Sequence, residues 1–167
     1  MKSPYLAHEH RLADILAAIQ VMGSHLWDSR PIEHWKTHLG PAPQSAATWE
    51  ALFAQHPEFF GDIVYDDRTT YFLRLRRAYE RTIDPTSLRE LSDVEIQQRK
   101  EADTYNSAKL ARRPLTPPQI EALMKAAIEL QVRAGALDDR RRWWLPLLAA
   151  ALGFLGALAG SLVNKLM

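Results

Sequence analysis

A long run without any charged side chain, from Trp143 to Val163, constrains this chain more than any other feature of its sequence. Among the charged residues only Lys165 follows the run, and all the others precede it. About 20 residues of α-helix span about 30 Å, which is the thickness of the hydrocarbon core of a bilayer. Residues 143–167 are therefore predicted to form a single transmembrane helix in contact with membrane lipid, with spanning side chains at Trp144, Leu148, Leu152, Leu155, Leu158 and Val163.

The residues that precede this run favour one orientation in the membrane. Arg140, Arg141 and Arg142 stand directly before Trp143, whereas one lysine follows the run. Basic residues are enriched on the cytoplasmic side of membrane helices, and tryptophan is enriched at the interface. The pattern predicts a bacterial-type, single-pass inner-membrane (cell-membrane) protein whose N-terminal part is cytoplasmic.

Small residues within the apolar run indicate helix association. Gly153, Gly156 and Gly160 lie three and four positions apart. Such small residues allow two helices to approach closely in lipid, where apolar side chains alone give little driving force. We therefore expect the chain to form a homo-oligomer through this face.

An amphipathic helix is predicted over 116–142, immediately before the apolar run. Its apolar residues recur at alternating spacings of three and four, at Ile120, Leu123, Ala127, Leu130, Ala134 and Leu137. This spacing is typical of a heptad seam between two copies, but it also suits a helix that packs on its own N-terminal domain. Both interpretations make the segment a stalk between that domain and the predicted membrane helix.

The N-terminal part predicts three helices and a hairpin. Leu12, Ile15 and Ile19 form one apolar stripe before Gly23, and further helices begin at Pro31 and Ser45. Residues 63–65 and 71–76 then alternate in the manner of two strands. Residues 84–115 read as a linker with one short polar helix, which opens at a capping box formed by Ser92 and Glu95. The predicted fold class is mainly α with a small β-hairpin.

Two sequence blocks carry a resemblance to a known fold. These are WEALFAQHPEFF (residues 49–60) and YFLRLRRAYERTIDP (residues 71–85), within an order of three helices followed by a hairpin. Residues 1–83 resemble a winged-helix domain. The chain also resembles small bacterial proteins with the same N-terminal block and a C-terminal anchor, some of which are labelled N-carbamoyl amino-acid hydrolases. The resemblance implies a winged-helix-like cytoplasmic domain, followed by a stalk and a membrane anchor.

The residue types present predict no enzyme, no cofactor and no metal site. The chain has no cysteine, and its glycines form no phosphate-binding loop or dinucleotide motif. His34 and His38, four apart on one predicted helix, can share one ion, but neither a cysteine nor a known histidine motif supplies the third ligand that zinc requires. No catalytic residue is therefore assigned.

These observations favour a protein-interaction module that tethers or assembles an unknown protein partner at the cytoplasmic face of the membrane. Its candidate contact residues are the aromatic side chains Trp27, Trp35, Phe59 and Phe60. One alternative is a membrane-tethered nucleic-acid binder that touches phosphates through Arg74, Arg76, Arg77 and Arg81. Nucleic acid is the less favoured partner, because the candidate recognition helix at 45–56 has no lysine or arginine. Another alternative is an effector that acts on the membrane through its associating C-terminal helix.

Overall fold

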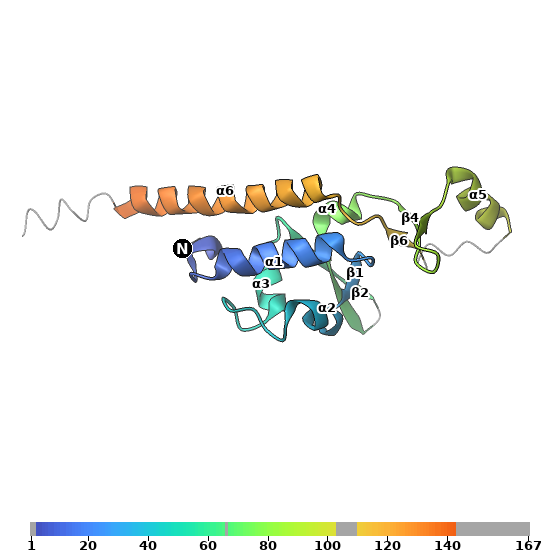
Figure 1. Ribbon diagram of the computed structural model, residues 1–167. Helices are drawn as coiled ribbons and strands as arrows, with labels where there is room; N and C mark the ends of the chain where they lie inside the picture. The colour runs from blue at the N-terminus through green and yellow to red at the C-terminus, as the bar shows by residue number, and fades with distance from the viewer. Residues whose placement is uncertain (1–2, 66, 103–109, 143–167) are drawn as a thin grey trace, which may run out of the picture.

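The computed structural model describes residues 3–65, 67–102 and 110–142. Short helices alternate with short strands until a long final helix (Figure 1). The elements in chain order are η1 (Pro4–Leu6), α1 (Arg11–Ser24), β1 (Ser29–Pro31), α2 (Ile32–Leu39), α3 (Trp49–Gln55), β2 (Phe60–Tyr65), β3 (Arg68–Leu73), α4 (Arg74–Arg77), β4 (Arg81–Asp84), β5 (Arg89–Glu90), α5 (Asp93–Glu101), β6 (Ala111–Arg112) and α6 (Pro117–Arg142).

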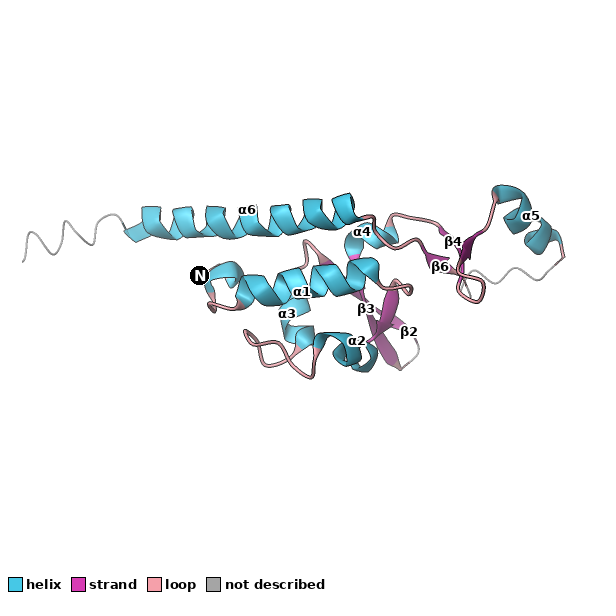
Figure 2. Ribbon diagram, in the orientation of Figure 1, coloured by secondary structure: helices cyan, strands magenta, loops and turns pink. Residues whose placement is uncertain are grey.

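The first sheet joins β1, β3 and β2 in that spatial order, and both pairings are antiparallel. In the β2–β3 hairpin, Phe60 pairs with Leu73 and Tyr65 pairs with Arg68. Strand β1 enters between α1 and α2 and adds a third strand on the other side of β3. Figure 2 shows this sheet beside α1, α2 and α3, so that its buried face and the helices enclose one core.

The long helix α6 belongs to that same core. It lies along α1 in Figure 1, and its residues Ile120, Ala127 and Ala134 are buried in the main cluster. Gly23 favours this close approach, because a Cβ atom there would lie 3.1 Å from the Ile120 side chain, which would have to shift. The Leu115 amide also donates a hydrogen bond to the Gly23 carbonyl, at 2.9 Å. The predicted seam therefore packs on the chain's own domain, and the helix expected to be a stalk is part of the domain.

The guanidinium of Arg76 joins four elements of the fold. Its side chain is fully buried, and it donates hydrogen bonds at 2.6–3.1 Å to the carbonyl oxygens of Met22, His25, Leu26, Trp27 and Arg112. Burial lowers the pKa of Arg76 to about 10, and the charge of Asp28 opposes this shift. The guanidinium therefore stays charged at neutral pH. The end of α1, the loop after it, α4 and β6 all depend on this one side chain.

A second sheet extends from the domain on the side away from the C-terminal end of α6 (Figure 2). Strand β4 pairs with β5 on one side and with β6 on the other. Helix α5 follows β5 and begins at a complete capping box between Ser92 and Glu95, which confirms that local prediction. The predicted linker at 84–115 therefore contains two strands as well as its short helix.

The fold class expected from the sequence is wrong. The described part of the chain is a mixed α/β structure with two three-stranded antiparallel sheets, not a mainly α domain with one hairpin. Strands of two or three residues, such as β1, β5 and β6, are too short to show alternation. The predicted second hairpin arm, residues 71–76, ends at Leu73, because the chain turns into α4 to place Arg76 inside.

The predicted membrane anchor is not supported either. No helix in the described ranges is long and apolar enough to span a bilayer, and the expected span, at 143–167, lies outside those ranges. This finding contradicts the predicted single-pass inner-membrane protein with a C-terminal transmembrane helix.

Replacing Arg76 with methionine should destabilise the protein by roughly 3 kcal/mol or more, because five buried or partly buried carbonyl groups lose a charged donor. Arg74→Met is the matched control on the same helix. Arg74 is exposed and donates one hydrogen bond, to the Phe60 carbonyl, so its loss should cost less than about 1 kcal/mol. Urea denaturation measures both changes, and equal losses would contradict the role given to Arg76.

Candidate functional site

The four arginines predicted to contact phosphate do not form one surface. Arg76 is buried among carbonyl groups, and the Nε of Arg74 is bonded to the Phe60 carbonyl at 2.9 Å. Arg77 lies over the Phe72 ring and 3.9 Å from the carboxylate of Asp28. Arg81 belongs to β4. The alternation of charged and apolar residues predicted that these arginines share one solvated face. Helix α4 turns Arg76 into the core instead, so the four side chains are separated.

Arg77 and Arg81 do share a polar pocket between the two sheets. It has a volume of about 490 Å³ and is lined by Tyr65, Arg77, Glu80, Arg81, Ile96, Lys100 and Arg112. Much of its positive charge is already balanced. The buried carboxylate of Asp28 accepts a hydrogen bond of 2.6 Å from Arg112 and lies near Arg77. Glu80 adds a second acidic group to the lining.

Three of the four aromatic side chains predicted as contact residues belong to the core. Trp35, Phe59 and Phe60 are buried, and the Trp35 indole donates a hydrogen bond to the Tyr71 carbonyl at 3.0 Å. Trp27 is half-buried, and the guanidinium of Arg30 lies 4.3 Å from its ring. These residues therefore do not present a common aromatic surface to a partner.

Most residues assigned to the membrane lie outside the described ranges. These are the flanking Trp143, the spanning residues Trp144, Leu148, Leu152, Leu155, Leu158 and Val163, and the association residues Gly153, Gly156 and Gly160. Arg140, Arg141 and Arg142 form the last residues of α6, and Arg140 is exposed.

Three histidines converge where α1 ends and α2 passes beside it. His34 and His38 lie one turn apart on α2, and His25 is the C-cap residue of α1. The Nε2 atoms of His25 and His34 are 3.3 Å apart, and a ligand nitrogen from each of the three rings lies within 4.8 Å of the others. The ring centres are 4.9–5.2 Å apart. His25 and His34 are half-buried and His38 is exposed, so the cluster opens to solvent.

The surroundings of the cluster keep its inner rings neutral. The buried Trp35 ring packs edge-on against both His25 and His34. Burial lowers the pKa of His25 and that of His34, and the nearby charge of Arg30 lowers both further. Neutral imidazole has a free lone pair, which is the form that binds metal ions.

The sequence analysis found only part of this cluster. It identified the i, i+4 pair of His34 and His38 and assigned no metal because a third ligand was lacking. His25 supplies that ligand from nine residues upstream, across strand β1. A local signal existed in the short spacing from His25 to His34, but no helical periodicity connects the two residues.

An apolar groove lies at the other end of α1. It has a volume of about 480 Å³ and lies between η1 and the C-terminal half of α6, with lining residues Ser3, Tyr5, Leu6, Leu130, Arg133, Ala134, Leu137 and Asp138. The apolar members dominate the lining, and Leu137 at its edge is 65% exposed. The sequence placed Leu130, Ala134 and Leu137 on one helix face, but it gave no sign that η1 would stand opposite.

Near this groove, the buried side chains of Tyr5 and His56 are both bonded to the carboxylate of Glu58, which is itself partly open to solvent. The Tyr5 hydroxyl donates to the Glu58 carboxylate, which also lies 3.1 Å from Nδ1 of the fully buried His56. Burial alone would raise the pKa of Glu58, but its bonds to Tyr5 and His56 lower it. Burial also raises the pKa of Tyr5, so this phenol is a poor nucleophile or base. The group is a structural link between η1 and the end of α3.

Comparisons with known proteins give no family for this chain. No family model matches it, and neither the curated proteins nor the solved structures contain a match. The expected resemblance to winged-helix proteins and to small anchored bacterial proteins is therefore not supported, and the assignment of a function depends on the geometry alone.

The stability of the protein should fall as the pH falls below about 6.5, because His56, like His25 and His34, is held neutral in the folded state. Burial lowers the pKa of His56, although Glu58 opposes the shift. The unfolded chain then binds a proton that the folded chain does not, which costs up to about 1.4 kcal/mol per pH unit until the lowered pKa is reached. Glu58 adds to the loss only below about pH 4.5, since its own pKa is lowered.

Urea denaturation at pH 7.5 and 5.5 measures this dependence. His56→Phe should be less stable at pH 7.5, because Glu58 loses one partner, but its stability should change less between the two pH values. His10→Gln, at an exposed position, is the control and should keep the wild-type dependence. An unchanged dependence in His56→Phe would contradict the assignment.

Proposed function

We propose that this chain is a protein-interaction module that receives an amphipathic helix of a partner protein in the groove between η1 and α6. The observation that carries the proposal is the apolar lining of this groove, to which Tyr5, Leu6 and Leu130 contribute. Exposed apolar surface of this kind is unfavourable in water and is typical of sites for protein contact. The proposal keeps the contact function expected from the sequence, moves it from the aromatic residues to this groove, and involves no membrane.

The end of α6 supports a helical partner. Figure 1 shows this helix continuing beyond η1, so one of its sides in the last turns has no neighbour from the rest of the described chain. Nearer the middle of the helix, Ile128 and Val132 are 42% and 65% exposed, on a side away from Leu137. A helix that is apolar on two sides is normally covered on both. An amphipathic helix laid into the groove would cover the side of Leu137 by the helix-in-groove mode of recognition.

The charges at the groove give the partner a direction. Arg133 and Asp138 line the groove one and a half turns apart and have opposite signs. A partner helix with an acidic residue near Arg133 and a basic residue near Asp138 would bind in one orientation. Such rim charges contribute more to orientation and to the rate of association than to affinity.

Nucleic-acid binding through the four predicted arginines has less support. Arg76 is fully buried and cannot contact a phosphate at the surface. Arg77 and Arg112 both lie at the carboxylate of Asp28. A phosphate in the pocket between the sheets would have to compete with that carboxylate. The apolar lining of the groove has no charge to displace, although Arg133 beside it lies 3.7 Å from the carboxylate of Glu129.

Site-specific photo-crosslinking in the native host tests the proposal. Benzoylphenylalanine in place of Leu137 should give a crosslinked product, whereas the same probe in place of Val94, which is equally exposed on α5, should not. The added substitution Leu6→Glu should reduce the Leu137 product by about tenfold, because it places a charge in the groove.

Two results would contradict this proposal. One is a product of equal yield from the two positions, or one that Leu6→Glu leaves unchanged, since neither would depend on the groove. The other is a single product of twice the chain's mass, which would identify a second copy and not a separate partner. Circular dichroism of the Leu6→Glu protein controls for loss of the fold.

A further inference from the structure

We infer that His25, His34 and His38 form a binding site for a late first-row divalent metal ion, of which zinc is the reference case. The three side chains come from the C-cap of α1 and from α2 beside it, and together they offer three imidazole nitrogens within 4.8 Å of one another. Imidazole is a preferred ligand of zinc, copper and nickel, whereas magnesium and calcium require oxygen. The proposal is independent of the groove and its partner.

The distance between the two inner ligands fits a tetrahedral ion. Zinc–nitrogen bonds are about 2.05 Å long, so two such bonds at the tetrahedral angle separate their nitrogen atoms by about 3.3 Å. The Nε2 atoms of His25 and His34 are 3.3 Å apart. This separation matches two corners of a tetrahedral zinc site, and the ion would replace the hydrogen bond that the two nitrogens share in its absence.

The third ligand completes the site by a side-chain rotation. All three ligand atoms lie within 4.8 Å of one another, which is wider than the tetrahedral edge. His38 is exposed and on the same face of α2 as His34, so its ring can turn toward the ion at little cost. The fourth position faces solvent and would take water. Three protein ligands with one open position is the arrangement of many zinc sites.

The main chain beside His25 supports the required tautomer. A histidine that binds metal through Nε2 normally donates its Nδ1–H to a carbonyl group or a carboxylate. Nδ1 of His25 lies 3.3 Å from the Trp27 carbonyl oxygen, which is placed to accept that proton. The same nitrogen lies 3.1 Å from the Trp27 amide, so without metal the ring can accept a hydrogen bond instead. Metal binding at Nε2 then selects the tautomer of His25 that donates Nδ1–H to the Trp27 carbonyl over the one that accepts from the Trp27 amide.

Arg76 acts as a positioning residue for the site. It donates to the carbonyl oxygens of His25 and Trp27, at 2.6 and 3.1 Å, and thereby fixes the backbone on both sides of the inner ligand. The buried Trp35 ring packs edge-on against the rings of His25 and His34. A ligand set held in advance loses little conformational entropy on binding.

Positive charge near the site limits its strength. Arg30 and Arg76 both act on the His25 ring, and the metal-ligand cluster contains no carboxylate. Repulsion from these groups opposes a divalent cation, so we expect micromolar affinity and not the much tighter binding of sites with charged ligands. An anion in the open fourth position would relieve part of this repulsion.

Titration of the full chain with zinc chloride at pH 7.5, followed by calorimetry and tryptophan fluorescence, tests the site. We expect one ion per chain, a change in the emission of Trp35, and an increase of several degrees in the melting temperature at a hundredfold excess over the dissociation constant. Magnesium chloride should give none of these changes. A dissociation constant for zinc above about 100 µM would overturn the proposal.

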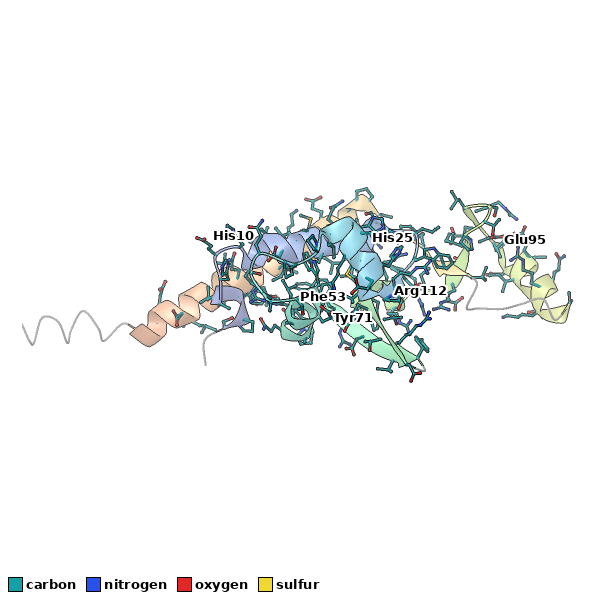
Figure 3. All side chains as sticks on the ribbon, turned by 90° about the horizontal axis from the view of Figure 1, so that it is seen from below. His10, His25, Phe53, Tyr71, Glu95 and Arg112 are labelled. Atoms are coloured by element: carbon teal, nitrogen blue, oxygen red, sulfur yellow. The ribbon has the colours of Figure 1, made fainter. Side chains whose placement is uncertain are left out.

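Histidine variants locate the ion. His38→Gln changes an exposed residue and should weaken zinc binding by at least about tenfold without loss of the fold. The matched control is His10→Gln. His8 and His10 form another pair of neighbouring rings, 5.4 Å apart, and Figure 3 shows His10 far from His25 along the molecule. Equal affinity of His38→Gln and wild type, or loss of binding in His10→Gln, would overturn the assignment.

A cysteine variant gives a positive test of the third ligand. The natural chain has no cysteine, so His38→Cys introduces one thiol with no background. With cobalt(II) as the probe, the variant should show the thiolate-to-cobalt charge-transfer absorption that a wild-type site with histidine ligands lacks. Cobalt bound without this absorption would show that position 38 is not a ligand, and it would overturn the three-histidine site.

Discussion

The buried guanidinium of Arg76 is the interaction on which the rest of the structure depends. One side chain from the short helix α4 satisfies carbonyl groups at the end of α1, in the loop that follows and in β6. A planar group with five donors suits this role, whereas lysine would offer only a single ammonium. The cost of burying the charge is offset by several charge-assisted hydrogen bonds and by the nearby carboxylate of Asp28. The core helix α1 and strand β6 of the second sheet are tied to this centre.

The position of α6 follows from a second constraint, the lack of a side chain at Gly23. Because the two helices approach closely there, Ile120 enters the core and the first half of α6 is fixed along α1. The helix is about 39 Å long and α1 about 21 Å, so α6 necessarily runs past the end of its neighbour. Within the described ranges, the C-terminal half of α6 passes η1, and the apolar groove between the two is the result of this mismatch in length.

Local sequence signals predicted part of this fold, and long-range contacts determined the rest. The capping box of Ser92 and Glu95 and the glycine after α2 act within a few residues; Gly40 adopts a φ of 94°, which favours glycine, so its helix ends as expected. The direction of Arg76 could not be predicted in this way, because its acceptors are 36 to 54 residues away. An arginine in a charged run normally faces solvent. The same limit applies to the groove, whose two sides come from opposite ends of the chain.

The histidine cluster shows how a chain without any metal-binding motif can still assemble ligands. A motif places its ligands at a recognisable spacing along the sequence, and in this cluster only His34 and His38, four apart on one helix, have such a spacing. The position of His25 depends on the loop at 24–28, whose carbonyl groups point inward to Arg76. The carbonyl oxygen of His25 thus accepts from Arg76, while its ring lies against the rings of His34 and His38 on α2. The buried cation that organises the core therefore also helps to hold the backbone from which the third imidazole extends.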